Sequence, residues 1–257
     1  MQKEINSIFI IGAGNVGSQL AIALHSIVEI KGVYSKNGVS SKLIAEELDI
    51  PYFETIDSFP ESDLVLICSN DDAIEAIINS IPDTAKIAYT SGSIELKNLP
   101  GRKKIGVFYP LQTFSKERIV DFSNVPLLIE ASNDAFKQEL FQLALKLSTN
   151  VSFANSDERK KLHIGAVFIN NFTNHLAQIA KEYVEANELN WEYLKPLLAE
   201  TTNKILDLNP FDAQTGPARR NDQLVIQQHL KELEGLPKDI YKILTDSIIQ
   251  TYQTKKK

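Results

Sequence analysis

The run GAGNVG at Gly12–Gly17 has the residue types and spacing of a phosphate-binding turn. It follows the apolar segment 7–11 and opens a helical pattern, which is the order this chemistry requires. The first glycine permits a tight turn, the second lets a pyrophosphate approach the backbone, and the third lets the helix pack on the strand. The helix N-terminus then offers free N–H groups. We therefore expect a dinucleotide at Gly12, Gly14, Asn15, Val16 and Gly17. The alternative is a glycine-rich turn without a ligand.

Two polar residues follow the second predicted strand, residues 29–34, where many dinucleotide sites bind the adenosine ribose. Sites that use NAD usually have a carboxylate here, which accepts hydrogen bonds from the ribose hydroxyls. This chain instead has Ser35 and Lys36. A hydroxyl and an ammonium group bind a 2′-phosphate, whereas a carboxylate repels it. The sequence thus predicts NADP(H) in preference to NAD(H), unless Lys36 is an ordinary exposed loop lysine.

More polar residues follow the next predicted strands, 63–68 and 86–89. Ligands of parallel sheets bind outside the carboxyl ends of the strands. We therefore expect Ser69, Asn70 and Ser91 near the ribose and the nicotinamide. Cys68, the last residue of its strand, is expected to be a small buried residue and not a nucleophile.

Strands and helices that alternate along the first 155 residues are expected to position these candidate binding residues. Alternating strands and helices are typical of a parallel sheet with right-handed crossovers. The predicted strands are 7–11, 29–34, 52–53, 63–68, 86–89, 105–108, 125–129 and 151–153, and the helices between them are 16–26, 40–48, 71–80 and 134–147.

The pattern changes near Ser156, and no strand is predicted after residue 153. Ser156 or Asp157 is predicted to cap a long helix. The predicted helices are 157–186, 191–208, 222–233 and 238 onward, with a loop at 209–221. The fold class is therefore α/β: a Rossmann domain with a doubly wound, mostly parallel sheet (1–155), followed by an all-α domain (156–257).

The composition is that of an ordinary globular protein, with 43% hydrophobic and 23% charged residues. A net charge of -6 argues against a nucleic-acid partner. One cysteine and four scattered histidines predict neither a disulfide nor a metal site. We found no signal peptide and no apolar run long enough to span a bilayer, so we expect a cytoplasmic protein without a membrane partner.

Five runs together resemble the Rossmann-like proteins that carry a DUF2520 helical domain. These are related to the coenzyme-F420-dependent NADP oxidoreductases and, more distantly, to pyrroline-5-carboxylate and ketopantoate reductases. The runs are GAGNVG, TSGS at Thr90–Ser93, YPLQTFS at Tyr109–Ser115, LHIGAVFINNF at Leu162–Phe172 and QTGPARRND at Gln214–Asp222. The resemblance covers essentially the whole chain. It departs from the family at Tyr109, where His is usual, and at Asn221, where Gly is frequent, so it implies no role for either residue.

The resemblance implies a nicotinamide-dependent oxidoreductase whose helical domains pair into a homodimer, with a cleft between domains. It also implies that His163 is the acid or base and that Asn171 orients the substrate. His163 and Asn170 are seven residues apart and share one helix face, with Asn171 beside them. The alternative is a histidine satisfied by a backbone group and an asparagine bonded across a dimer interface.

The loop Gln214–Asp222 is a second candidate, because its arginines could grip a carboxylate or a phosphate. Thr215 and Arg220 match the family's motif most closely, so the resemblance places them on the substrate side. Gln112, which follows a predicted strand, could line the same cleft or brace the contact between domains. Asp222 could hold an arginine or cap the following helix.

Three functions therefore remain open. The first is an NADP(H)-dependent oxidoreductase that transfers hydride to or from a small, carboxylate-bearing substrate. The second is a non-catalytic NADP(H)-binding sensor or regulatory protein. The third is a ketopantoate- or imine-type reductase.

Overall fold

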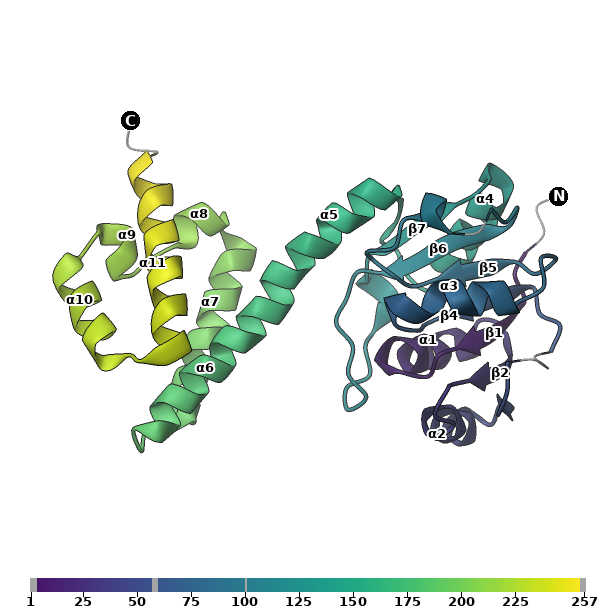
Figure 1. The fold of residues 1–257 in the computed structure, drawn as a ribbon, viewed down its shortest axis with the longest axis horizontal. Coiled ribbons are helices and arrows are strands. Elements are labelled where there is room, and N and C mark those ends of the chain that lie inside the picture. The colour runs from purple at the N-terminus through teal and green to yellow at the C-terminus, as the bar shows by residue number, and fades with distance from the viewer. Residues whose placement is uncertain (1–3, 57–59, 100, 255–257) are drawn as a thin grey trace. The chain divides into compact units, whose positions relative to one another are not determined.

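The computed structural model describes residues 4–56, 60–99 and 101–254. The chain divides into two compact units, Met1–Phe172 and Thr173–Lys257. The first unit contains an eight-stranded sheet with the strand order β3-β2-β1-β4-β5-β6-β7-β8 (Figure 1). The strands are β1 (Ser7–Ile11), β2 (Glu29–Tyr34), β3 (Tyr52–Phe53), β4 (Leu64–Ile67), β5 (Ile87–Tyr89), β6 (Ile105–Pro110), β7 (Leu127–Ala131) and β8 (Val151–Phe153).

Helices cover both faces of this sheet. Helices α1 (Asn15–His25), α2 (Val39–Leu48) and α4 (Asp134–Leu145) contribute to one apolar core, and α3 (Asp71–Ser80) contributes to the core on the other face. All four residues of β4 are buried, as the nearly continuous apolar run predicts for a strand covered on both sides. The burial of both faces makes the first unit a doubly wound α/β structure.

The chain adds strands first on one side of β1 and then on the other. The chain moves outward from β1 through β2 to β3, then returns to add β4 on the other side of β1. In such sheets ligands bind outside the carboxyl ends of the strands at this switch point. All strand pairs are parallel except β6 with β7, where Phe108 faces Ile129 in an antiparallel register. The predicted Rossmann class, with a mostly parallel sheet, is confirmed.

The helix after β8 begins one residue earlier than predicted. Its N-cap is Asn155, and not Ser156 or Asp157, because the Asn155 side chain accepts hydrogen bonds from the backbone of Asp157 and Glu158. The Glu158 carboxylate accepts in turn from the Asn155 backbone N–H at 2.8 Å, which completes a capping box. Helix α5 (Ser156–Ala166) is followed by a π-helical turn, η3 (Val167–Phe172), which the sequence did not predict.

Every described element of the second unit is a helix. Its elements are α6 (Thr173–Ala186), η4 (Trp191–Leu194), α7 (Lys195–Asp207), α8 (Pro210–Ala213), α9 (Pro217–Arg220), α10 (Gln223–Glu232) and α11 (Gly235–Thr254). The prediction of a loop over 209–221 is wrong in part, because Pro210 and Pro217 each begin a short helix. The predicted domain boundary at 155/156 stays a prediction. None of the described helices is long and apolar enough to cross a membrane.

Candidate active site

The three glycines of the turn after β1 have different surroundings. Gly12 has a φ of 102°, and a Cβ there would collide with the backbone carbonyl of Cys68. A Cβ at Gly17 would collide with the carbonyl of Gly12, so this position also requires glycine. A Cβ at Gly14 would have no heavy atom within 4 Å. Gly12 and Gly17 therefore shape the turn, and Gly14 is the position where a ligand can approach the backbone.

The N-terminus of α1 follows directly from this turn. Gly14 caps the helix without any side-chain hydrogen bond to its first N–H groups. The Asn15 amide instead donates to the Phe114 carbonyl at 3.0 Å. The buried Gln19 side chain donates to the Ser115 carbonyl and accepts from the Val120 N–H, both at 3.0 Å. Helix α1 thus fixes the loop after β6, and its first backbone N–H groups have no capping side chain.

Ser35 and Lys36, which are predicted to contact the adenosine ribose, differ in how available their side chains are to a ligand. The Ser35 hydroxyl is buried and bonded to Ser41 Oγ at 3.0 Å, and it also accepts from the Ser41 N–H. It therefore braces the start of α2. Lys36 is exposed. A second lysine, Lys116, reaches the same helix start and donates to Ser40 Oγ at 3.2 Å. No sequence pattern pointed to Lys116, which lies 76 residues from its partner.

The carboxyl ends of the central strands border a hollow of about 510 Å³. It extends from the glycine turn to Tyr109 and His163, and every residue that lines it belongs to the first unit. The predicted site residues that it brings together are Gly14, Asn15, Val16, Ser69, Asn70, Ser91, Gln112 and His163. The predicted contacts at the strand ends thus share one hollow with the histidine of α5.

Tyr109 and His163 form a hydrogen-bonded pair at one side of this hollow. The Tyr109 hydroxyl lies 2.9 Å from Nδ1 of His163, and the two rings meet edge to face. A Cβ on Gly92 would lie 2.8 Å from the His163 ring and 2.9 Å from Cζ of Tyr109. Glycine at position 92 is therefore what lets the two rings approach the loop after β5. Burial raises the pKa of the Tyr109 hydroxyl.

A second hollow, of about 740 Å³, adjoins the first and shares Tyr109, Gln112 and His163 with it. Its other lining residues include Asn170 and Asn171, both exposed. These two asparagines lie in the π-helical turn, where more residues fit into each turn than in an α-helix. Such turns are frequent at functional sites. The predicted pair His163 and Asn171 thus borders one hollow together with Gln112.

A buried arginine anchors α5 one helical turn before His163. Arg159 is 1% exposed and forms an ion pair with the Glu130 carboxylate of β7. Its Nε donates to the Ser91 carbonyl at 3.1 Å, and one of its terminal nitrogens donates to the Ile94 carbonyl. No sequence pattern pointed to this residue, because a lysine-rich helix start gives no sign of a buried charge. Arg159 fixes α5 against the loop that contains Gly92.

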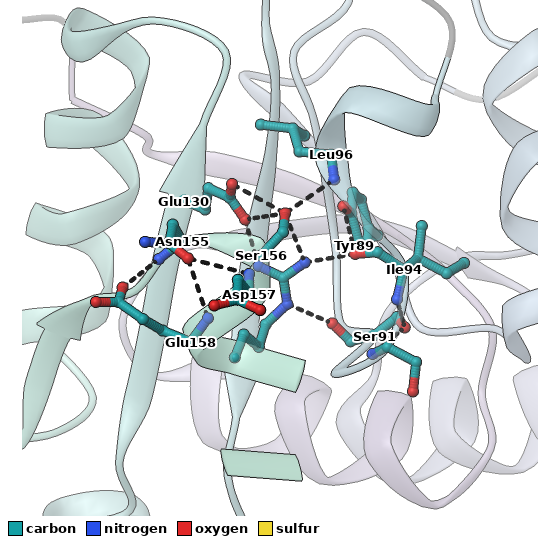
Figure 2. A network of polar contacts seen from close by, with 11 residues as sticks. Tyr89, Ser91, Ile94, Leu96, Glu130, Asn155, Ser156, Asp157 and Glu158 are labelled. Carbon is teal, nitrogen blue, oxygen red and sulfur yellow. Dashed lines mark hydrogen bonds and ion pairs between the residues drawn. The ribbon is translucent and has the colours of Figure 1, made fainter. Parts of the chain in front are cut away.

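Ser156 closes this network, which Figure 2 shows from close by. Its hydroxyl donates to Glu130 at 2.8 Å and accepts from the Leu96 N–H at 3.1 Å. The Ser91 hydroxyl accepts from the N–H groups of Ser93 and Ile94, so it shapes the same loop. The loop after β5, the start of α5 and the end of β7 are therefore tied together by satisfied polar groups.

Cys68, which directly follows β4, is buried, as predicted. Burial raises the pKa of its thiol to about 12, and a hydrogen bond with Thr90 opposes this only in part. The thiolate is the nucleophilic form of cysteine, so this residue is inert at neutral pH.

The remaining predicted residues lie in the second unit. Asp222 is the N-cap of α10, where it accepts from the Val225 N–H at 3.3 Å. Thr215 and Arg220 are exposed. The neighbouring guanidinium of Arg219 stacks over the Tyr252 ring at 3.9 Å. Within the described part of the chain, no group of three or more His, Cys, Asp or Glu residues could hold a metal ion.

The fold and the glycine turn define a Rossmann-type protein with an all-helical C-terminal region. A family model described as a domain of unknown function (DUF2520) matches residues 125–248. A "putative NADP oxidoreductase" from Bacteroides fragilis is 36% identical in sequence to this chain, and the two structures have a TM-score of 0.89. The match covers 96% of this chain and 98% of that chain. The chain therefore belongs to the DUF2520 family of Rossmann-like proteins, as its sequence motifs predict.

Two more distant structures share the fold. A protein from Thermotoga maritima is 17% identical, with a TM-score of 0.73, 97% of this chain covered and 100% of that chain. A reductive aminase from Aspergillus terreus, solved with NADPH and ethyl levulinate, is 14% identical, with a TM-score of 0.65 and coverage of 97% and 95%. Among the curated proteins, none matches this sequence.

Proposed function

We propose that this chain is an NADP(H)-dependent oxidoreductase that transfers hydride to or from a small, carboxylate-bearing substrate. The observation that carries the proposal is the hollow that joins the uncapped start of α1 to the Tyr109–His163 pair. Gly14 leaves room for a pyrophosphate, and the free N–H groups of α1 suit its charge. The similarity to the Bacteroides protein supports the same conclusion.

The preference for NADP(H) depends on two lysines near the start of α2. Lys36 follows β2, and Lys116 reaches Ser40. A 2′-phosphate at this position would receive charge-assisted hydrogen bonds, each contributing about 1.5–3 kcal/mol. We therefore expect Lys36→Ala and Lys116→Ala each to weaken NADPH binding at least about tenfold and NADH binding little. Lys42→Ala is the matched control, since Lys42 is an exposed lysine of α2 that lies 4.0 Å from Glu46. Equal losses for the two dinucleotides would refute the preference.

The chemistry needs little from the protein besides placement and a proton. A bound nicotinamide supplies or accepts the hydride at the substrate carbon. In the reducing direction the π electrons of the C=O or C=N bond move to oxygen or nitrogen, which then gains a proton. We assign the handling of this proton to His163, and the orientation of the substrate to Asn171 and Gln112, because the three residues border one hollow.

Substitution of these side chains separates chemistry from cofactor binding. We expect His163→Ala and Asn171→Ala to lose turnover about 100-fold or more while the Kd for NADPH is unchanged. The assay follows NADPH oxidation across a panel of 2-keto acids and cyclic imines, which includes the substrates of ketopantoate- and imine-type reductases. Full activity in both variants would refute the assignment. Tight NADPH binding with no oxidation across the panel would favour the sensor.

We propose from the sequence motif that the exposed guanidinium of Arg220 binds the substrate carboxylate, with Thr215 five residues before it. Asp222 already caps α10, so we expect it to act on substrate binding only by shaping this loop. Arg220→Lys should raise KM for carboxylate substrates about tenfold and leave their esters unaffected, because lysine cannot form the forked contact. An equal rise for acids and esters would contradict the assignment.

We also propose that the helical unit forms a homodimer. Among its described residues the buried apolar side chains are only Ala218, Ile226 and Tyr252, too few for an independent core. Exposed leucines and isoleucines, such as Leu244 beside an apolar groove of about 550 Å³, suit an interface. We expect sedimentation to give a dimer and Leu244→Glu to weaken it, with Lys242→Glu as the control. A monomeric wild type would refute the dimer.

A further inference from the structure

The hydrogen bond between Tyr109 and His163 can run in either direction. Its atoms, the Tyr109 hydroxyl oxygen and His163 Nδ1, are 2.9 Å apart, and each group is able to donate. If Tyr109 donates, the neutral imidazole carries its proton on Nε2. If Nδ1 donates, Nε2 is an acceptor. The direction of this one bond therefore decides what His163 offers to a bound molecule.

The surroundings of Tyr109 favour the hydroxyl as the donor. Tyr109 is 8% exposed, and within the described part of the chain its hydroxyl is bonded to Nδ1 of His163. Donation from Nδ1 would leave the phenolic hydrogen with no acceptor among the described residues, and only solvent in the hollows that Tyr109 borders could replace it. Burial raises the pKa of Tyr109, the charge of Arg159 opposes this and the charge of Asp71 adds to it, so the hydroxyl keeps its proton at neutral pH.

The packing around the pair keeps both rings in place. Gly92 approaches both so closely that a Cβ would lie 2.8 Å from Nδ1 itself. Tyr109 is the second-last residue of β6, and Arg159 fixes α5 one turn before His163. Both partners thus project from anchored elements, which is the condition for a hydrogen bond to select one tautomer.

We propose that Tyr109 is a positioning residue that donates to Nδ1 and holds His163 in the tautomer with the proton on Nε2. This inference rests on the proposed function, because it matters for chemistry only if His163 meets the substrate. His163 borders both hollows, so Nε2–H is the donor left for a carbonyl oxygen or an imine nitrogen. A hydrogen bond to that atom polarises the double bond and favours hydride addition at carbon.

Nitrogen NMR of the full-length chain, without cofactor or substrate, tests this directly. In spectra of the neutral imidazole we expect a protonated signal for Nε2 and an unprotonated, hydrogen-bonded signal for Nδ1 of His163. His163→Asn assigns the signals by their loss. Tyr109→Phe should move the Nδ1 signal and introduce a mixture of tautomers. Tyr241→Phe is the matched control, since its hydroxyl lies 2.8 Å from Nδ1 of another histidine, His229.

The outcomes separate this inference from the proposed function. A protonated Nδ1 in the wild type, or a His163 spectrum unmoved by Tyr109→Phe, would overturn the role of Tyr109 even if the protein is a reductase. The wild-type spectrum decides the tautomer even if the Tyr109→Phe variant fails to fold. In turnover assays with an active substrate, Tyr109→Phe should lower kcat about tenfold with the Kd for NADPH unchanged.

Discussion

The replacement of Arg159 by methionine should destabilise the first unit strongly. Arg159 is 1% exposed and bonds to Glu130, to the Ser91 carbonyl and to the Ile94 carbonyl. Loss of one member of a buried ion pair costs about 3–5 kcal/mol, because the other charge stays buried without its partner. Glu130 retains the Ser156 hydroxyl at 2.8 Å and is 18% exposed, so the lower half of this range applies. A loss of about 3 kcal/mol is a large fraction of the stability of a typical domain, about 5–15 kcal/mol.

Urea unfolding followed by circular dichroism measures the loss, and amide hydrogen exchange in β5 and α5 locates it. Lys181→Met is the control, because the exposed pair of Lys181 and Glu185 should contribute less than about 1 kcal/mol. The double variant Arg159→Met, Glu130→Leu should recover most of the stability, since both charges are then removed. A loss below about 1 kcal/mol for Arg159→Met, or a double variant less stable than the single one, would refute the reasoning.

Three further outcomes follow from burial and close contact. Gly17→Ala should unfold the first unit, because its Cβ meets backbone, whereas Gly14→Ala should leave the unfolding free energy within about 0.5 kcal/mol and weaken NADPH binding in titrations. Gly92→Ala should lose about 1–3 kcal/mol in urea unfolding, because two rings must move. Cys68 has a folded pKa of about 12 against an ordinary 9.0, so its contribution is complete below pH 9 and is lost as pH rises toward 12. Between pH 9 and about 11 the wild type should lose about 2–3 kcal/mol more than Cys68→Ala.

The sheet was predictable because each strand is a short apolar run between polar turns. The run DLVLIC predicted β4, which lies at the centre of the sheet with every residue buried. The antiparallel pairing of β7 with β6 was not predictable, because periodicity gives the existence of a strand and not its direction. The short helices after Pro210 and Pro217 were missed because prolines and a glycine are also typical of loops.

The candidate site was predictable only where local sequence defines it. The glycine turn is a contiguous motif, and the polar residues after β4 and β5 follow from the position of strand ends. Lys116 and Ser40 are 76 residues apart, and Arg159 and Glu130 are 29 apart, so no local pattern relates them. The π-helical turn was missed for another reason, because a period of 3.6 residues was assumed throughout the helix.

The network that stabilises the first unit also determines the geometry of the candidate site. Arg159 holds the loop after β5 through the Ser91 carbonyl, and the next residue of that loop is Gly92, against which Tyr109 and His163 pack. Arg159 and His163 are four residues apart on α5, so the anchor and the candidate acid lie one turn apart on the same side of the helix. A shift of the loop relative to α5 must therefore change the contact between Gly92 and the imidazole. For this reason a variant at Arg159 that still folds should move the His163 nitrogen signals, whereas Lys181→Met, in the other unit, should leave them unchanged.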